Sequence, residues 1–349
     1  MKAIIKTGEG EENTFFTDEA PEPKIAPGCI KIKVKAATIC GSDLHVYHSE
    51  LKMKENRYRY PVILGHEGSG EIVEIGQGVT DYEVGDRVVS ETTFSSCMQC
   101  EYCYESMFNC CDSRLGLGSA VNGFFAEYVL VPMRSVHKIP DHISYEAAAM
   151  MEPLACAVHG VLNRSNVEAG NIAVIIGPGP IGLLTAQVAK AAGCVVVVCG
   201  RSSSMKRLKF AKEVLGIQHV IDTTAVDVKT YVSKLTHGRM ADIIYECSGS
   251  PEAISEGFQI VKKHGQFVGL GTYADIIEFP YRLLIYEKEI TIAGVRSTVP
   301  SSWDKALRLV DYGLVNLEPM VSNILPLEKW KEGYKLFENK NAIKVVLKP

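Results

Sequence analysis

The first 150 residues are organised as short runs of β-type residues separated by turn-forming residues. Residues 30–36 alternate strictly between apolar side chains and lysines, and residues 70–75 and 86–89 form further short runs that contain β-branched residues. Such runs, bounded by Gly, Pro, Asn and Asp, are typical of half-buried β-strands. We therefore expect a β-rich domain in this part of the chain.

From about residue 170 the pattern changes to apolar runs of five or six residues that alternate with longer helical patterns. This rhythm predicts βαβ units, that is, a doubly wound parallel sheet with crossover helices. The expected strands are 171–176, 195–199, 219–221, 241–246 and 266–270, and the expected helices between them are 182–192 and 205–215.

After about residue 290 the βαβ rhythm fades. We expect helices at 303–312 and 327–337 and a closing strand at 342–347. At roughly 150 residues per domain, a chain of 349 residues holds two domains. We expect the tail to rejoin the β-rich part, so that residues 1–151 and 291–349 form one domain and residues 152–290 form the parallel-sheet domain.

Composition narrows the classes of partner. The chain carries 37 Lys and Arg against 41 Asp and Glu, a formal charge of −4, so no strongly basic domain is available to bind a nucleic acid. Its longest apolar run is far shorter than the roughly 20 residues that span a membrane. The first six residues alternate like a strand rather than forming the apolar core of a signal peptide. We expect a cytoplasmic protein with neither nucleic-acid nor membrane partners.

A glycine-rich motif follows the first strand of the parallel sheet. Residues 177–182 match G-x-G-x-x-G between an apolar strand and an uncharged helix, the context in which the motif binds a dinucleotide. The glycines allow a tight turn, close approach of a pyrophosphate and close packing of helix on strand. The predicted cofactor-binding residues of this turn are Gly177, Gly179, Pro180, Ile181 and Gly182.

The sequence after the next strand bears on which nicotinamide cofactor is used. No Asp or Glu lies between Glu168 and Glu213, although a carboxylate that binds the ribose diol is normally found about 20 residues after the motif. Arg201, Ser202 and Arg207 occupy that region instead and would suit a 2′-phosphate, which favours NADP modestly over NAD. The alternative is that Arg201 stacks on the adenine while Ser202 holds the 2′-hydroxyl, which suits NAD equally well.

The 11 cysteines are concentrated in one segment, because five of them fall between residues 97 and 111. Cys97, Cys100, Cys103 and Cys111 have the density of thiolates expected for a closed, structural zinc site. By spacing alone Cys110 could replace Cys111, and disulfides are the alternative to a metal.

Three separate segments offer further metal donors. Cys40, His66 and Glu67 supply a thiolate, an imidazole and a carboxylate, and Glu152 precedes the parallel-sheet domain. Singly, such residues are more often core or surface groups than ligands.

Several longer motifs resemble the zinc-dependent medium-chain alcohol dehydrogenases. The segments 65–76 and 85–88, the four-cysteine segment and the glycine-rich motif occur in the order of that superfamily, along the whole chain. Residues 151–156 and 294–296 are similar to the polyol (sorbitol-type) and threonine dehydrogenase branch, in which the position of Cys156 is not a zinc ligand. The resemblance implies an α/β fold with a β-rich GroES-like catalytic domain and a Rossmann domain, and a homo-oligomer, either a dimer or a tetramer.

The resemblance also implies roles for individual residues. Cys40, His66 and Glu67 would bind a catalytic zinc, with water or Glu152 completing the tetrahedron. Ser42 would take the proton of the substrate hydroxyl and pass it through the cofactor ribose toward His45. Arg296 would pair with Glu152 or Glu67, contact the substrate, or form a salt bridge between domains.

The expected function is hydride transfer between NAD(P) and a secondary alcohol of a polyol or polar polyol derivative, with two zinc ions per chain. Alternatives are a threonine-type hydroxy amino acid or a phosphorylated or acidic polyol as substrate. The last is suggested by four cations in a segment that borders the substrate pocket in the relatives, Lys52, Lys54, Arg57 and Arg59. Two other classes are a zinc-stabilised binding module without chemistry and a zinc-free quinone-type reductase.

Overall fold

The computed structural model describes residues 1–49, 59–271 and 276–349, which divide into two compact units. One unit comprises residues 1–152, 298–300 and 317–349, and the other comprises residues 153–297 and 301–316. This division follows the predicted pattern of an inserted parallel-sheet domain. It differs from the predicted boundary at residue 291, because the second unit also includes most of helix α9 (Pro300–Asp311).

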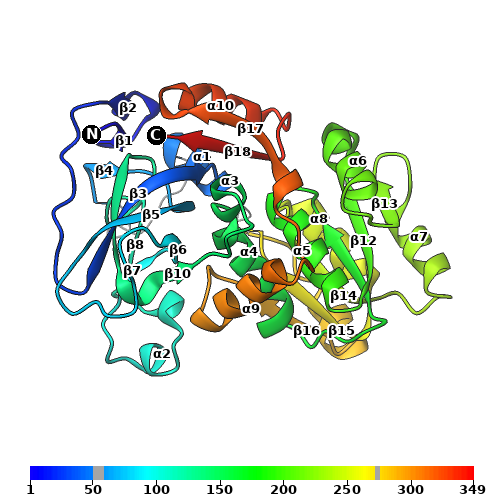
Figure 1. Cartoon of the computed structure of the whole chain (residues 1–349). Helices are drawn as coiled ribbons and strands as arrows, with labels where there is room; N and C mark the ends of the chain where they lie inside the picture. Colours follow the sequence, from blue (N-terminus) through cyan, green and yellow to red (C-terminus); the bar gives the residue numbers. More distant parts are fainter. Residues whose placement is uncertain (50–58, 272–275) are drawn as a thin grey trace. The chain divides into compact units, whose positions relative to one another are not determined.

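The first unit is built mainly from antiparallel sheets (Figure 1). Its largest sheet within the described residues has the order β10-β6-β5-β3-β18-β17, with β9 paired to β3, and a smaller sheet has the order β2-β1-β4. The strands are β1 (Ala3–Lys6), β2 (Thr14–Thr17), β3 (Cys29–Thr38), β4 (Val62–Ile63), β5 (Gly68–Ile75), β6 (Arg87–Ser90), β7 (Thr93–Ser95), β8 (Leu115–Gly116), β9 (Tyr128–Pro132), β10 (Val136–Lys138), β17 (Val321–Pro326) and β18 (Lys344–Lys348). The helices are α1 (Gly41–Tyr47), α2 (Glu101–Tyr104), α3 (Tyr145–Ala148), α4 (Met151–Val158, which continues into the second unit) and α10 (Trp330–Glu338).

The second unit is a parallel sheet of order β13-β12-β11-β14-β15-β16 with crossover helices. The strands are β11 (Ile172–Ile176), β12 (Val195–Gly200), β13 (His219–Asp222), β14 (Ala241–Glu246), β15 (Val261–Gly269) and β16 (Thr291–Gly294). The helices are α5 (Pro180–Ala191), α6 (Met205–Glu213), α7 (Val228–Leu235), α8 (Pro251–Ile260) and α9. The strand order reverses between β11 and β14, as in doubly wound dinucleotide-binding folds. The expected α/β fold class is therefore confirmed.

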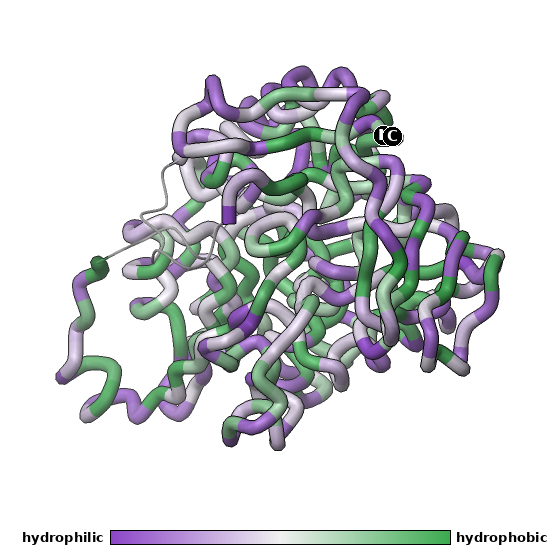
Figure 2. Tube along the Cα trace, turned by 90° about the vertical axis from the view of Figure 1, so that its left-hand side faces the viewer, coloured by the Kyte–Doolittle hydropathy of each residue, from purple (hydrophilic) through white to green (hydrophobic). Residues whose placement is uncertain are grey.

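Burial explains why the two units carry different sequence patterns. All five residues of β11 are buried, because helices cover both faces of a doubly wound sheet, and its sequence is a continuous apolar run. In β3, by contrast, Lys33 is exposed and Lys35 half-buried between buried Ile32, Val34 and Ala36. Figure 2 shows hydrophobic and hydrophilic stretches alternating along the chain. No described helix has the length and apolar composition that a membrane crossing requires.

The elements after residue 290 agree with the expected ones in type and differ in their ends. Helix α9 begins three residues earlier than expected, and the expected helix at 327–337 is a 3₁₀ turn (Leu327–Lys329) followed by α10. The short edge strand β16 and the strand β17 were not expected. Strand β18 pairs with β3 and β17, so the tail completes the largest sheet of the first unit.

Two glycines of the glycine-rich motif should respond differently to substitution. A Cβ added to Gly182 would lie 1.9 Å from the backbone oxygen of Gly177, whereas one added to Gly179 would meet no atom within 4 Å. We expect Gly182→Ala to lower the free energy of unfolding by about 2 kcal/mol or more, because the helix and the preceding turn must separate. Gly179→Ala should cost less than about 1 kcal/mol, since it alters only the residue that precedes α5. Urea unfolding measures both, and equal losses would contradict the close packing at Gly182.

Candidate functional site

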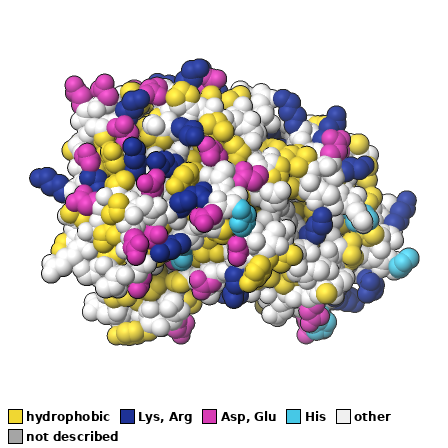
Figure 3. All heavy atoms as spheres, viewed as in Figure 1, with side chains coloured by type: hydrophobic (Ala, Val, Ile, Leu, Met, Phe, Trp, Pro, Cys, Tyr) yellow, Lys and Arg dark blue, Asp and Glu magenta, His cyan; other side chains and the backbone are white. Residues whose placement is uncertain are grey.

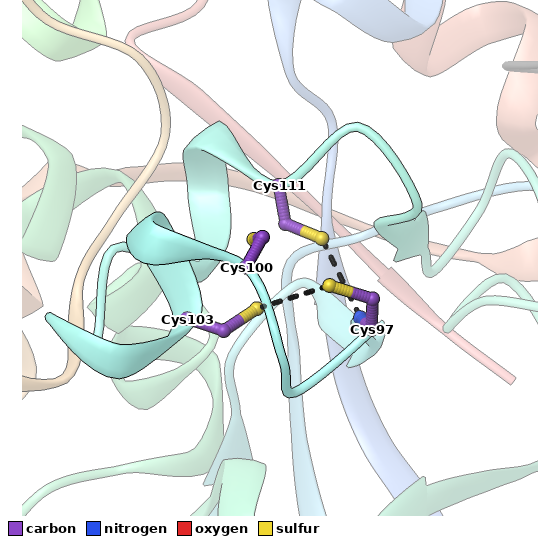
Figure 4. Close-up of side chains that lie close together, drawn as sticks. All are labelled: Cys97, Cys100, Cys103 and Cys111. Atoms are coloured by element: carbon purple, nitrogen blue, oxygen red, sulfur yellow. Dashed lines mark hydrogen bonds between the residues drawn. The ribbon is translucent and has the colours of Figure 1, made fainter.

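The four cysteines predicted to bind a structural metal lie around one point. Their sulfur atoms all lie within 4.8 Å of one another, in a loop that follows β7 and includes α2 (Figure 4). The sulfur atoms of Cys97 and Cys103 are 3.9 Å apart. A tetrahedral site with Zn–S bonds of about 2.3 Å places its sulfur atoms roughly 3.8 Å apart, so the spacing suits zinc and is far too long for a disulfide.

The state of the thiols is compatible with metal binding. All eleven cysteines are free thiols, and Cys110 is not part of the cluster. Burial acts to raise the pKa of Cys103, but hydrogen bonds from Ser96 and neighbouring groups lower it to about 6. A backbone hydrogen bond from Gln99 and contacts with other thiols lower the pKa of Cys97. A backbone hydrogen bond from Cys103 acts to lower the pKa of Cys100, but burial and the neighbouring thiols raise it to about 12. Because the thiolate is the ligand form, the lowered pKa values of Cys97 and Cys103 favour binding of a cation, and a cation would also offset the repulsion that raises the pKa of Cys100.

A second cluster joins donors from distant parts of the sequence. Cys40 follows β3 and precedes α1, and His66 and Glu67 lie between β4 and β5. Their sulfur, nitrogen and oxygen atoms lie within 4.8 Å of one another. Thiolate, imidazole and carboxylate together form a donor set that zinc accepts. Glu152 is buried at the beginning of α4 and is not among the residues of this cluster.

Asp43 orients two members of this cluster. Its Oδ2 accepts a hydrogen bond of 2.8 Å from the backbone N–H of Cys40, and its Oδ1 lies 3.2 Å from Nδ1 of His66. Burial acts to lower the pKa of His66, but the Asp43 carboxylate outweighs this effect and raises it well above the usual value. A carboxylate on Nδ1 leaves Nε2 of a histidine as the nitrogen that faces a metal. Asp43 was not expected at this site from the sequence, although its position in the first turn of α1, three residues after Cys40, was a signal.

The carboxylate of Glu67 has two oxygens in different situations. Oε2 lies 2.5 Å from Nζ of Lys344 and accepts a hydrogen bond from the hydroxyl of Thr38. Oε1 is buried and has no hydrogen-bond partner among the described residues. A buried carboxylate oxygen without a hydrogen bond lowers the stability of the folded protein. The sulfur of Cys40 and a ring nitrogen of His66, both possible metal ligands, lie next to this side chain. The orphaned oxygen therefore suits a cation bound in the cluster.

Lys344 was also missed by the sequence analysis. It begins β18, 277 positions after Glu67 in a chain of 349 residues, and both side chains are almost completely buried. Burial acts to lower the pKa of Lys344, but the charges of Glu67 and its neighbours raise it. No local sequence signal marks this pair, because only the pairing of β18 with β3 brings the lysine to the site.

We expect Lys344→Met to destabilise the protein strongly, because it leaves the buried charge of Glu67 without its partner. Removing one member of a buried ion pair costs about 3–5 kcal/mol. Lys348→Met on the same strand is a matched control, since the Lys348–Glu146 pair is partly exposed and worth about 0–1 kcal/mol. Urea unfolding measures both losses, and the double variant Lys344→Met with Glu67→Gln should recover much of the stability. A loss as small as the control's would show that Glu67 does not need Lys344.

The other residues expected near the substrate occupy different elements. Ser42 and His45 lie three positions apart on α1, so they share one side of that helix, and both are half-buried. Arg296 is exposed and belongs to the second unit. Its expected partner therefore stays a prediction.

The glycine-rich turn has the geometry that a dinucleotide site needs. Strand β11 ends at Ile176, and α5 begins at Pro180 with Gly179 at its N-cap. Gly177 has a φ of +101°, which side chains rarely adopt, and a Cβ there would lie 2.9 Å from Ser248. The open space above Gly179 lies at the N-terminus of α5, whose free N–H groups and dipole favour a phosphate.

The region after β12 contains a carboxylate that the sequence analysis did not anticipate. Arg201 and Ser202 are exposed there, as expected for ligand contacts, whereas Arg207 is buried in α6. Asp222 ends the neighbouring strand β13, and its Oδ2 accepts a hydrogen bond of 2.5 Å from the hydroxyl of Ser202. The expectation that no anion lies near Arg201 was therefore wrong. Asp222 belongs to the neighbouring strand and not to the segment that follows β12 in the sequence.

The cationic segment bordering the expected substrate pocket lies mostly outside the described residues. This applies to Lys52, Lys54 and Arg57. Arg59 is described and donates its backbone N–H to the carbonyl of Ser119. On the face shown in Figure 3, acidic and basic side chains are intermingled.

Comparison with known proteins assigns both units. Residues 26–141 match the Alcohol dehydrogenase GroES-like domain, and residues 180–312 match the Zinc-binding dehydrogenase domain. The first match covers the Cys40 cluster and the four cysteines, and the second covers most of the parallel sheet.

Relatives align with the whole chain. A sorbitol dehydrogenase from Halalkalibacterium halodurans is 43% identical over 100% of this chain and 99% of its own length. A D-arabitol-phosphate dehydrogenase from Enterococcus avium is 39% identical over 99% and 97%. An L-threonine 3-dehydrogenase from Pyrococcus horikoshii is 36% identical over 99% and 98%.

Two solved structures share the fold over the full length. The 2R,3R-butanediol dehydrogenase from Bacillus subtilis has a TM-score of 0.88 and 30% identity, and covers 100% of this chain and 99% of its own. A zinc-binding dehydrogenase from Sinorhizobium meliloti, bound to NADP, has a TM-score of 0.89 and 30% identity with the same coverage.

Proposed function

This chain belongs to the zinc-dependent medium-chain alcohol dehydrogenases, in the polyol and threonine dehydrogenase branch, and we propose that its substrate is a polyol or a polar polyol derivative. The enzyme transfers hydride between NAD(P) and an alcohol. In the proposed reaction a secondary carbon is oxidised and the product is a ketone.

One observation carries the assignment of the reactive centre. Cys40, His66 and Glu67 bring three different donor atoms together, and the buried Oε1 of Glu67 has no other partner among the described residues. When zinc is bound there, it supplies Lewis acidity that lowers the pKa of the substrate hydroxyl. Glu67 and Glu152 would alternate at the metal or share it through water.

The residues of α1 would handle the proton. Ser42 follows Cys40 by two residues, so its hydroxyl can accept the proton released by the substrate. His45, one turn further along α1, would receive that proton through the ribose of the cofactor. Asp43 would keep His66 and Cys40 oriented through the contacts described above.

The four-cysteine loop would hold a second zinc with a structural role. Four protein thiolates fill a tetrahedral coordination shell, so no position is left for a substrate. Zinc binding at such a site contributes directly to the free energy of folding. We therefore propose two zinc ions per chain.

Mutations should distinguish the structural role of one zinc site from the catalytic role of the other. Cys100→Ser should destabilise or unfold the loop around residues 97–111, because structural zinc is part of the folding energy. Cys40→Ser should leave a folded protein that has lost its activity. Metal analysis, thermal unfolding and turnover of both variants test this, with Cys110→Ser as a matched control outside the cluster. Two findings would contradict the assignments: wild-type turnover in Cys40→Ser, or two zinc ions per chain in Cys100→Ser at unchanged stability.

The carboxylates of the site favour a substrate with several hydroxyl groups. A carboxylate that lines a substrate pocket can accept hydrogen bonds from the further hydroxyls of a polyol, which a plain alkyl alcohol does not offer, a difference of about 1–3 kcal/mol for each carboxylate. Two of the similar proteins are named for sorbitol and for D-arabitol phosphate. The second name supports a phosphorylated polyol as the runner-up, and the threonine dehydrogenases support a hydroxy amino acid.

We expect kcat/KM for polyols to exceed that for ethanol or 2-butanol by about tenfold or more, which corresponds to about 1.4 kcal/mol. The panel contains sugar alcohols, diols, L-threonine and polyol phosphates, and the formation of reduced cofactor is monitored with both NAD and NADP. Glu152→Gln should lower turnover and should also reduce the ratio of kcat/KM for polyols to kcat/KM for alkanols. Better turnover of simple alkanols would overturn the polyol assignment even if both zinc ions were present.

For the cofactor, we propose a modest preference for NADP over NAD. Arg201 is exposed at the carboxyl end of β12, where a 2′-phosphate would lie, and could form a charge-assisted hydrogen bond with it. One structure similar to this chain is bound to NADP.

We also propose a homo-oligomer, a dimer or a tetramer. Strand β16 is an edge of the parallel sheet, so its outer backbone groups are available for pairing. Large apolar side chains are exposed in the segment that leads to this edge and on the edge itself, a sign of an interface. They are Ile276, Phe279, Tyr281, Ile285, Tyr286 and Ile292.

A further inference from the structure

A small polar cluster lies at the carboxyl ends of β12 and β13. Gly200 and Asp222 are paired residues at the ends of these parallel strands. The Oδ2 of Asp222 accepts a hydrogen bond of 2.5 Å from the hydroxyl of Ser202. Its Oδ1 accepts two hydrogen bonds from Thr224, one of 3.0 Å from the backbone N–H and one of 2.7 Å from the hydroxyl. The hydroxyls of Ser202 and Thr224 also contact each other. The carboxylate is thus fixed beside the residues that follow β12.

This position matters because the end of β12 is where doubly wound folds bind the adenosine ribose. The negative charge of Asp222 would lie close to a 2′-phosphate that Arg201 attracts. The hydroxyl of Ser202 donates to Asp222, so in this arrangement it cannot also donate to a phosphate. Both effects work against NADP, whereas a neutral 2′-hydroxyl is not repelled by the carboxylate and can donate to the oxygen of Ser202.

The charge of Arg201 has further acidic neighbours. Hydrogen bonds, first of all with Ser250, lower the pKa of Glu252 on α8, and burial raises the pKa of Glu256 on the same helix. The charge of Arg201 interacts with both carboxylates and acts to lower both pKa values. The field at the end of β12 is therefore mixed rather than cationic.

We propose that Asp222 is a specificity-determining residue that limits the preference for NADP. Arg201 attracts the 2′-phosphate, and Asp222 opposes it by charge repulsion and by occupying the hydroxyl of Ser202. This inference rests on the proposed cofactor site and goes beyond it, since it names the residue that keeps the preference modest.

The test is the isosteric substitution Asp222→Asn. Its side-chain oxygen can still accept from Thr224, while its amide can donate to Ser202 and so free the serine hydroxyl for a phosphate. Binding of adenosine 2′,5′-bisphosphate and of 5′-AMP to the zinc-loaded enzyme is measured by calorimetry. We expect the ratio of their affinities to shift about 5- to 10-fold toward the bisphosphate, as for an exposed charge a few ångströms from a phosphate. Part of the shift should disappear in 0.5 M salt.

Two further variants complete the experiment. Asp311→Asn removes the same charge from an exposed position on α9 and should leave the ratio unchanged. Arg201→Ala should lower the affinity for the bisphosphate about 10- to 100-fold and affect 5′-AMP little. The ratio of kcat/KM for NADP and NAD should follow the same order in the three variants.

The results of these measurements distinguish a wrong role for Asp222 from a wrong assignment of the cofactor site. An unchanged ratio in Asp222→Asn, with a clear loss in Arg201→Ala, would overturn the role of Asp222 alone. Equal losses of both probes in Arg201→Ala would place that residue against the adenine and overturn the proposed 2′-phosphate site together with this inference. A wild-type enzyme that bound neither probe would show that the adenosine site itself is wrongly assigned.

Discussion

The burial of Glu67 is the constraint on which the reactive centre depends. A carboxylate without contact with water needs compensation for both of its oxygens. Lys344 and Thr38 supply it for Oε2, while Oε1 has no hydrogen-bond partner among the described residues, in a side chain that lies beside Cys40 and His66. The chain thus stabilises half of the carboxylate by itself and leaves the other half for a cation. Since Lys344 comes from the final strand, the centre is complete only when the tail has joined the largest sheet.

The two proposed metal-binding clusters differ in a way that follows from their positions in the fold. The four cysteines lie in one loop of 15 residues, so local folding around an ion can assemble them. Cys40 and His66 are held by strands and by Asp43, so the framework fixes them before any ion binds. A closed set of four thiolates suits a structural ion, and a preorganised set of mixed donors suits one that must also bind a substrate.

In the second unit, too, some features depend on a local motif and others on contacts between strands. The glycine-rich turn is defined by backbone geometry, since Gly177 has a positive φ and Gly182 touches the preceding turn. The proposed selectivity for a 2′-phosphate would instead depend on side chains at the carboxyl ends of neighbouring strands. Asp222 and Ser202 are 20 positions apart in the sequence, yet they form a short hydrogen bond because β12 and β13 are adjacent.

The sequence by itself determined the fold class, five of the six described strands of the parallel sheet, the glycine-rich turn and the four-cysteine cluster. Each of these depends on local order, either the period of apolar residues or the spacing of like residues within about 15 positions. The association of Cys40, His66 and Glu67 was expected from resemblance to a family and not from spacing.

Only the tertiary structure decided which groups surround those residues. Asp43, Lys344 and Asp222 acquire their roles through contacts made by capping, by the pairing of the last strand and by adjacency in the sheet. The expected absence of an anion near Arg201 failed for the same reason. The residues that follow one strand can be identified from the sequence. Electrostatic interactions act through space, so they also involve residues of the neighbouring strand, which is known only from the structure.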